Sequence, residues 1–304
     1  MLLLDRHIKE ELLSAGAIAV GYARAQEVPE RVWQTYQQWL DDKRNGELNY
    51  MHNHPELRRD PRGLLDNAQT VISVAWPYLP PVLREEGLPI IARYAYSPDY
   101  HKSIRKILKP ILRRWEGAYG ITSRVCVDSA PMLERFWAQH SGIGFIGWNG
   151  CLIVPGYGSW VFLTEILIDK ALQPDTPSNG HCGQCGACLN ACPTGALGAD
   201  GHVDCRKCLS ALTIETPGKI PPGQIYPPTI AGCDKCQLVC PHNIHARPTE
   251  IPQFATIPDI LTLTAEELDS MNEESFRRRF AGTALLRPGL AGLRANIACT
   301  SPDR

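Results

Sequence analysis

Apolar residues divide the first part of the chain into short runs and longer periodic stretches. Five runs have the length and the β-branched or aromatic content of buried strands, at residues 17–23, 70–76, 89–96, 123–129 and 159–168. Between these runs, apolar residues recur at helical spacing. The alternation predicts a mixed domain of the α/β (α+β) class over residues 1–173.

The clearest helical pattern lies at residues 99–115. Its apolar face carries Ile104, Ile107, Leu108, Ile111, Leu112 and Trp115. Its basic face carries Lys102, Arg105, Lys106, Lys109 and Arg113. Such a face is more often a solvated surface than an RNA site, and both interpretations stay open. Pro110 should kink this helix, and residues 1–16 predict an amphipathic first helix.

The composition changes at residue 174. A connector rich in Pro, Ser and Gly begins there, and a cysteine-rich segment follows it, which we assign to a second domain over residues 174–250. Helical patterning returns over residues 251–304, where Thr264 and Glu267 have the spacing of a capping box. We therefore expect two domains and a short helical C-terminal segment.

Composition and charge limit the cell compartments and the binding partners that the protein can have. Of the 304 residues 44% are hydrophobic, and no apolar run approaches the roughly 20 residues that span a bilayer. The first residues lack a secretory signal pattern, and twelve cysteines without such a signal are typical of metal binding in the cytoplasm. Because the formal net charge is −1, any RNA contact must come from a local basic patch. We expect a cytoplasmic monomer without membrane contact.

The cysteines form two related motifs. Residues 181–198 read HCGQCGACLNACPTGALG, in which Cys182, Cys185, Cys188 and Cys192 form C-x2-C-x2-C-x3-C-P. In this ferredoxin run three thiolates bind one [4Fe–4S] cluster and the fourth binds a second. Further ligands of a cluster pair appear at Cys233, Cys236 and Cys240, the last of which precedes Pro241.

One thiolate of the second cluster is missing from these two motifs. Cys205 and Cys208 lie between them, and either could supply it from a loop. Two zinc sites built from C-x2-C pairs are the alternative, although zinc does not explain the x3-C-P endings. Paired clusters transfer single electrons, so the reactive centre should lie elsewhere.

Asp128, at the end of an expected strand, is the first candidate for that centre. A structural role also explains it, with Asp128 or Ser129 as a helix N-cap and Pro131 in the first turn. If apolar neighbours enclose Asp128, burial would raise its pKa and make it a neutral acid. The nearby GIGFIG at 142–147 matches G-x-G-x-x-G, but it follows a helix and precedes a strand, the reverse of a dinucleotide site.

Six segments, in order along the chain, resemble the epoxyqueuosine reductase family. They are ARYAYSPDYHKSIRKIL (92–108), VDSAPMLER (127–135), GIGFIGWN (142–149), CGQCGACLNACPTGAL (182–197), CLSALTIE (208–215) and GCDKCQLVCPHN (232–243). The resemblance implies a cobalamin-binding and substrate-binding domain followed by a ferredoxin-like domain with two [4Fe–4S] clusters. It also implies reduction of the epoxide of epoxyqueuosine to queuosine, at the wobble position of the tRNA anticodon loop.

The same resemblance assigns roles to residues of this chain. Asp128 is the expected acid. The expected cofactor contacts are Tyr100, His101, Asp128, Arg135, Gly147, Trp148, Asn149 and Ser210. The family's cysteine before LTIE falls on Cys208, not on Cys205. The first cluster would then be held by Cys182, Cys185, Cys188 and Cys240. The second would be held by Cys192, Cys208, Cys233 and Cys236.

Three features depart from related patterns. Trp148 stands where family members usually have Lys or Arg, so a cationic contact is lost or replaced by stacking. The chain ends at Arg304, without the C-terminal helical repeats of longer members. Asp5-x-His7-x-x-Glu10 lacks the glycine of the D-x-H-x-x-G motif, so we expect cobalamin to bind without a protein ligand below the metal.

The mechanism implied is electron delivery through the clusters to cobalamin, with Asp128 protonating the departing oxygen. The basic face of residues 99–115 and the run Arg277, Arg278 and Arg279 are candidates for tRNA contact. The alternatives are a reductive dehalogenase-like cobalamin enzyme acting on a small molecule and a non-catalytic ferredoxin-type electron carrier. The sequence does not identify the electron donor.

Overall fold

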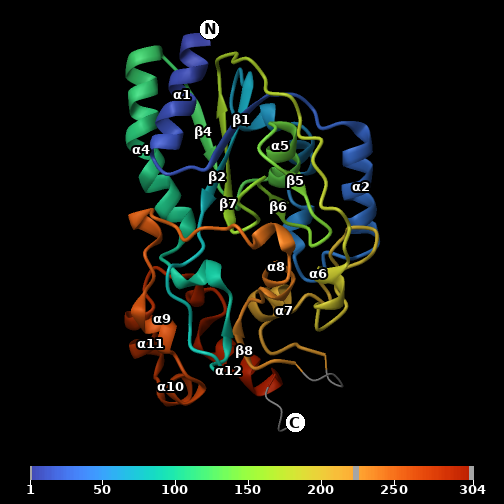
Figure 1. The fold of residues 1–304 in the computed structure, drawn as a ribbon, viewed down its shortest axis with the longest axis vertical. Coiled ribbons are helices and arrows are strands. Elements are labelled where there is room, and N and C mark those ends of the chain that lie inside the picture. Colours follow the sequence, from blue (N-terminus) through green and yellow to red (C-terminus); the bar gives the residue numbers. More distant parts are fainter. Residues whose placement is uncertain (1, 222–225, 301–304) are drawn as a thin grey trace.

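One half of the protein is built on an antiparallel four-stranded sheet. The computed structural model describes residues 2–221 and 226–300 (Figure 1). The strand order is β1–β2–β7–β4. The bounds are Ala19–Arg24 for β1, Thr70–Pro77 for β2, Val161–Ile168 for β7 and Ser123–Cys126 for β4. Two shorter strands, β5 (Phe145–Ile146) and β6 (Leu152–Ile153), pair beside this sheet.

Helices cover both faces of the sheet. On one face lie α1 (Leu2–Ser14) and α4 (Tyr100–Tyr119), whose apolar side chains share a core with β1, β2 and β7. On the other face lie α2 (Glu30–Asp41) and α5 (Glu134–His140), which bury Trp33 and Trp137 against β2 and β7 (Figure 1). A short helix, α3 (Pro55–Arg59), follows α2.

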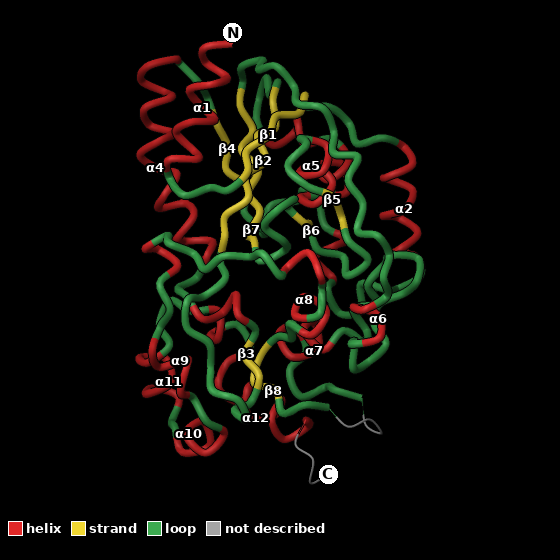
Figure 2. Tube along the Cα trace, in the orientation of Figure 1, coloured by secondary structure: helices red, strands yellow, loops and turns green. Residues whose placement is uncertain are grey.

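The other half consists mainly of loops and short helices (Figure 2). The cysteine region contributes α6 (Ala187–Asn190), α7 (Leu209–Glu215) and α8 (Lys235–Leu238). A parallel pair joins β3 (Ile90–Ile91) to β8 (Thr229–Ala231). The C-terminal helices are α9 (Pro258–Thr262), α10 (Ala265–Ser270), α11 (Glu273–Arg279) and α12 (Gly289–Thr300).

This second half has its own core. Ile91 and Tyr96 pack with Ile230 and with Phe276 and Leu293 of the C-terminal helices. Segments before, within and after the cysteine region therefore share one apolar interior, so the cysteine loops are fixed to a packed body.

The structure confirms most of the expected elements. The runs at 17–23, 70–76 and 159–168 form β1, β2 and β7, while the run at 123–129 ends as a strand at Cys126. The first helix, the helix at 99–115 with its buried apolar face, and the Thr264–Glu267 capping box are all present.

The strand predicted at 89–96 is wrong. Only Ile90–Ile91 forms a strand, and Arg93–Tyr96 forms a 3-10 helix. Its apolar residues are buried against the C-terminal helices. A buried segment of either kind produces a continuous apolar run, so the pattern alone could not distinguish a strand from a short helix.

Candidate active site and iron–sulfur cluster region

Four cysteines surround a hollow next to α6. These are Cys182, Cys185, Cys188 and Cys240, which we call the first cysteine set. Gly147, Trp148 and Asn149 line the same hollow. The Asn149 side chain is buried, and its Nδ2 has no hydrogen-bond partner among the described residues. An amide donor without a partner, at a hollow lined by cysteines, suits a group that carries negatively charged sulfur.

A second group of cysteines lies deeper, between α7 and α8. Cys192, Cys208, Cys233 and Cys236 form this second cysteine set. Burial, together with the neighbouring Cys208 and Cys192, raises the pKa of Cys233 to about 11. Burial, followed by the nearby Cys151, Cys233 and Cys208, also raises the pKa of Cys236. Cys233 and Cys236 therefore each have other cysteines among their neighbours.

Local hydrogen bonds oppose the effect of burial on two thiols of this set. Burial acts to raise the pKa of Cys192, but donors from Thr194 and the Ala196 backbone more than offset it and lower that pKa. Cys208 is the N-cap residue of α7, and the backbone N–H groups of Ser210 and Ala211 face its sulfur. Ser210 therefore lies beside the second set through its backbone.

Cys205 stands apart from both sets. It lines a separate cavity of about 190 Å³ with Arg206, Glu215 and Lys219. Burial and the nearby Cys208 raise the pKa of Cys205 to about 12. Its position agrees with the choice of Cys208 as the thiol closer to the other cysteines.

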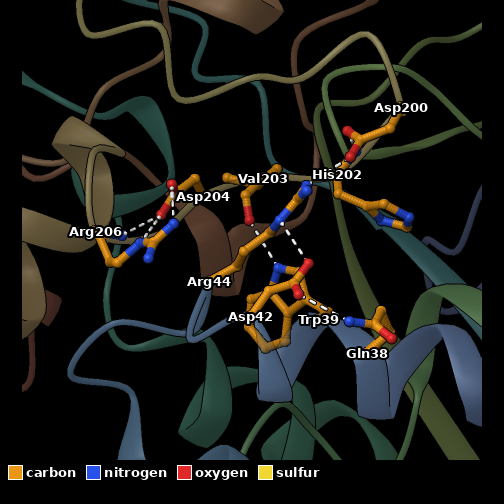
Figure 3. Close-up of polar contacts among 9 residues, drawn as sticks. All are labelled: Gln38, Trp39, Asp42, Arg44, Asp200, His202, Val203, Asp204 and Arg206. Carbon is orange, nitrogen blue, oxygen red and sulfur yellow. Dashed lines mark hydrogen bonds and ion pairs between the residues drawn. The ribbon is translucent and has the colours of Figure 1, made fainter.

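The loop that leads into Cys208 is held by the sheet-containing half (Figure 3). The indole Nε1 of Trp39 on α2 donates to the Val203 carbonyl oxygen at 2.8 Å. Arg44 binds the Asp200 carboxylate at 2.6 Å, and its carbonyl oxygen accepts the Cys205 N–H at 2.7 Å. We call these hydrogen bonds the Arg44 contact. It connects the two halves of the chain directly in front of a cysteine of the second set.

Asp128 follows β4 in a strained but well-held loop. Its φ of 53° lies in the left-handed region, which is uncommon for residues other than glycine. Its backbone N–H donates to Glu134 Oε1 at 2.6 Å. Its Oδ2 is 3.1 Å from His101 Nε2, and the His101 Nδ1 is 2.8 Å from Asp99 Oδ1. Both ring nitrogens of His101 therefore face carboxylates.

The N-cap role considered for Asp128 and Ser129 is wrong. Helix α5 begins only at Glu134, and Leu133 occupies the N-cap position without a side-chain hydrogen bond. The residues from Asp128 to Leu133 form a loop instead, which leaves the Asp128 side chain 59% exposed. Asp128 is therefore presented to solvent and not used to begin a helix.

The predicted rise of the Asp128 pKa is also wrong. Burial within the surrounding loop acts to raise the pKa, but hydrogen bonds from His101 and Tyr100 outweigh it and lower the pKa of Asp128. The Asp128 hydrogen bond, opposed by burial and supported by Asp99, raises the pKa of His101. The proton therefore resides on His101, one hydrogen bond from Asp128.

The carboxyl group that stays neutral is Glu134. Burial and the nearby charge of Asp128 raise the pKa of Glu134 to about 8. Glu134 lies within the segment VDSAPMLER, and no sequence pattern assigns it a role. Its spacing of six residues after Asp128 is the only sequence signal that could have connected the two.

The other predicted contacts divide between the two regions. Tyr100 stacks on His101 with ring centroids 4.1 Å apart, so it belongs with Asp128. Arg135 donates from a guanidinium nitrogen to the Gly150 carbonyl oxygen, so it lies with Gly147, Trp148 and Asn149 near the cysteines.

Two charged residues from the other half also face the Asp128 region, which the sequence analysis missed. Arg287 binds Glu215 at 2.6 Å, and its charge contributes to the lowered pKa of Asp128. Burial, Glu215 and Asp128 together raise the pKa of Tyr50 to about 12. Asp128 therefore faces a polar space bordered by both halves of the chain.

The glycines of residues 142–147 are explained by packing within the chain. A Cβ on Gly144 would lie 2.4 Å from the Ile153 carbonyl oxygen, and one on Gly142 would lie 2.6 Å from that of Thr176. The motif follows α5, contains β5 and precedes β6, so its order is not the strand–turn–helix order of a dinucleotide site. Among the residues that the structure describes, no helix is long and apolar enough to cross a membrane.

Comparison with known proteins gives a consistent result. A family model described as epoxyqueuosine reductase QueG, DUF1730, matches residues 58–129, and a 4Fe-4S double cluster binding domain matches residues 181–243. The chain is 38% identical to the epoxyqueuosine reductase of Cellulophaga algicola over 294 residues, which cover 95% of each protein. It is 34% identical to that of a Synechococcus strain over 308 residues, covering 99% of this chain and 95% of the relative.

Solved structures agree with the sequence relatives. An epoxyqueuosine reductase crystallised with a tRNA-Tyr epoxyqueuosine-modified stem loop superposes with a TM-score of 0.86 at 26% identity, covering 98% of this chain and 81% of that one. The Bacillus subtilis enzyme, with a catalytic aspartate loop swung out of its active site, gives 0.84 at 25% identity, covering 98% and 81%. The chain belongs to the epoxyqueuosine reductase family.

Proposed function

We propose that this chain reduces the epoxide of epoxyqueuosine in tRNA to the alkene of queuosine. The observation that carries the proposal is the Asp128–His101 pair, which opens to solvent and has Arg287, bound to Glu215 of α7, as a charged neighbour. The family relation supports the same substrate, since the relative with the stem loop is described with that modified tRNA. The alternatives of a dehalogenase-like enzyme and of a simple electron carrier lack comparable support.

The cysteine sets fit two [4Fe–4S] clusters. The first set would hold one cluster with the Asn149 amide as an additional donor, and the second set would hold the other. Cys185 of the first set is exposed. The pKa of Tyr94 is raised by burial, then by Asp234, which follows Cys233, and by Asp128. We infer that the first set would hold the cluster nearer to solvent, and that the clusters would supply single electrons to the reaction.

The polar groups around Asp128 are of the kinds that could bind cobalamin and a nucleotide. Carboxylate, imidazole, phenol and guanidinium groups border it, and both nitrogens of His101 are already hydrogen bonded. Cobalamin would be held there by these polar groups, with His101 engaged by Asp99 and Asp128. When bound, the clusters and cobalamin supply the electrons of the reduction.

The chain itself supplies and directs the proton. Conversion of an epoxide to an alkene releases its oxygen as water, and an alkoxide is too basic to leave unprotonated. Asp128, opposed by burial and supported by Asp99, raises the pKa of His101 and so favours its protonated form. Asp128 Oδ2 receives that hydrogen bond at 3.1 Å while its side chain remains open to solvent. The pair can therefore deliver a proton to the departing oxygen.

The basic face of α4 is the surface we assign to tRNA phosphates. Lys102, Arg105, Lys106, Lys109 and Arg113 are all exposed. Within the described ranges none of them forms an ion pair, and they extend roughly 16 Å from a point next to His101. The Arg277 and Arg278 side chains are instead paired with Glu273 and Glu274. We infer a monomer that acts in the cytoplasm, where tRNA is modified.

The test is anaerobic reconstitution with iron, sulfide and cobalamin, followed by incubation with a stem loop that carries epoxyqueuosine and a chemical reductant. Nucleoside analysis should show queuosine, with one oxygen atom fewer. An unchanged nucleoside from protein loaded with all three cofactors would overturn the proposed function.

A further inference from the structure

A polar row crosses the sheet beneath α5. The strand register aligns Gly21, Ser73, Glu165 and Cys126 side by side across β1, β2, β7 and β4. Glu165 is fully buried, and neither of its carboxylate oxygens has a hydrogen-bond partner among the described residues. A charged carboxylate in such a place is very costly, so Glu165 is held in its neutral form.

Helix α5 lies directly on this row. A Cβ on Gly21 would lie 1.9 Å from the Ser141 carbonyl oxygen, and Ser73 Oγ is 3.1 Å from Ser141 Oγ. These contacts fix the C-terminal end of α5 against the sheet. The N-terminal end carries Glu134, whose charge would act on the buried Glu165 and whose Oε1 binds the Asp128 N–H.

The Asp128 backbone needs such support. A non-glycine residue at φ 53° is strained, and the loop has no regular secondary structure of its own. The 2.6 Å hydrogen bond to Glu134 is the side-chain contact to the Asp128 backbone. This bond connects the strained residue to α5, so its loss would loosen the position of the carboxylate that meets His101.

We propose that Glu134 is the positioning residue of the active site. Its carboxyl group, anchored on α5 above the polar row, holds the Asp128 backbone so that the Asp128 carboxylate meets His101. The inference rests on the proposed function and deepens it. Glu134 acts here through its carbonyl oxygen as an acceptor and transfers no proton, which agrees with a pKa raised to about 8 by burial and by Asp128.

The positioning role predicts different kcat values for two substitutions of Glu134. Glu134→Gln keeps an acceptor oxygen at the same position, so kcat should remain within about threefold of the parent protein. Glu134→Ala removes the acceptor, and the displaced Asp128 should reduce kcat roughly a hundredfold. The KM for the stem loop should change little in both variants, because Glu134 does not touch tRNA in this assignment.

A second readout does not depend on activity. Hydrogen–deuterium exchange of residues 127–133, measured on the chain before any cofactor is added, should be faster in Glu134→Ala and unchanged in Glu134→Gln. Glu273 provides the matched control, since it is also the first residue of a seven-residue helix but pairs with Arg277 of its own helix. Glu273→Ala should leave both readouts unchanged.

The outcomes are distinguishable. If Glu134→Ala retains full kcat and normal exchange, or if Glu134→Gln loses as much kcat as Glu134→Ala, the positioning role is wrong. If Glu134→Ala fails to load clusters, the kcat of Glu134→Gln and the exchange of its loop decide the question. Failure of the proposed function would appear differently, as an inactive parent protein.

Discussion

At the scale of single residues, Asp128 and His101 divide the work that one neutral carboxylic acid was expected to do. Asp128 is open to solvent and has a lowered pKa because His101 and Tyr100 donate to it. His101 is the group that keeps its proton, supported by Asp128 and Asp99. The proton donor of the site is therefore a pair of residues, and its loss of the proton should occur at the pKa of His101.

This pair predicts the pH dependence of the reaction. The pKa of His101 is raised above its ordinary value of 6.5, so the proton is present below that pKa and is lost as the pH rises through it. The rate should fall on the alkaline side. Asp99→Asn should move this fall to lower pH, because it removes one of the charges that favour protonated His101.

Asp99→Asn is a well-matched variant for this measurement. Asp99 is the N-cap of α4, and asparagine caps a helix about as well as aspartate. The profile of kcat against pH checks the prediction. An alkaline limb that does not move in Asp99→Asn would show that His101 is not the titrating group.

The sequence identified these residues but not their arrangement. Asp128, His101 and Tyr100 were found through family resemblance, and Cys208 was selected in the same way. The contact between Glu134 and Asp128 was not predictable, because a left-handed residue and a six-residue loop leave no periodic signal. The charge state of Asp128 depends on partners 27 residues away, which local patterns do not reveal.

At the scale of secondary structure, β7 carries an internal acid that costs stability. Burial, followed by the nearby Glu134, raises the pKa of Glu165 well above its ordinary 4.5. A carboxyl with a raised folded-state pKa binds its proton in the folded chain after the unfolded chain has lost it. The free energy of unfolding is therefore highest, as far as Glu165 is concerned, below pH 4.5, and it decreases as the pH rises toward the folded-state pKa.

Glu165→Gln should remove this decline. The amide stays neutral at every pH, so the variant and the parent should unfold at similar temperatures near pH 5. At pH 8 the unfolding temperature of the variant should be higher than that of the parent by about 3 °C or more. Anaerobic thermal unfolding across this range measures the gap, and a gap that is constant with pH would contradict the prediction.

The basic face of α4 predicts a salt effect on tRNA binding. Double substitution Lys106→Gln and Lys109→Gln should weaken binding of the stem loop and reduce the slope of log affinity against log salt by roughly 0.7 per lost phosphate contact. The control is Arg277→Gln with Arg278→Gln, whose parent side chains are ion-paired on α11. Equal slopes in both double variants would exclude α4 as the phosphate surface.

The elements themselves were predicted unevenly. Helix α4 was clear because its apolar spacing is sustained over many residues, and the Thr264–Glu267 capping box has a local chemical signature. Residues 89–96 were misread because burial in the second half gives the same apolar run as a strand. The antiparallel order of the sheet depends on pairings between distant segments, which no local pattern specifies.

At the scale of the whole molecule, function requires both halves of the chain. The Asp128 region belongs to the sheet-containing half, and the cysteines belong to the other half (Figure 1). The Arg44 contact joins the halves at the loop before Cys208 (Figure 3). We therefore expect this contact to protect the second cluster in particular.

Loss of the Arg44 contact should destabilise one cluster selectively. In Trp39→Phe with Arg44→Ala, the second cluster should be lost to an iron chelator roughly fivefold faster, as expected for about 1 kcal/mol of lost support. The first cluster should be unaffected. Arg206→Ala is the control, since Arg206 pairs only with Asp204 of its own loop in Figure 3. Equal release of both clusters would contradict the assignment.

The measurement that tests the account most directly compares the parent protein with Asp128→Asn on the same stem loop. Both proteins are reconstituted without oxygen, and their iron and cobalt contents are measured before the nucleosides are separated. The account predicts queuosine from the parent and at least a hundredfold slower conversion by Asp128→Asn, with cofactor contents unchanged. Equal conversion by the two proteins would contradict it.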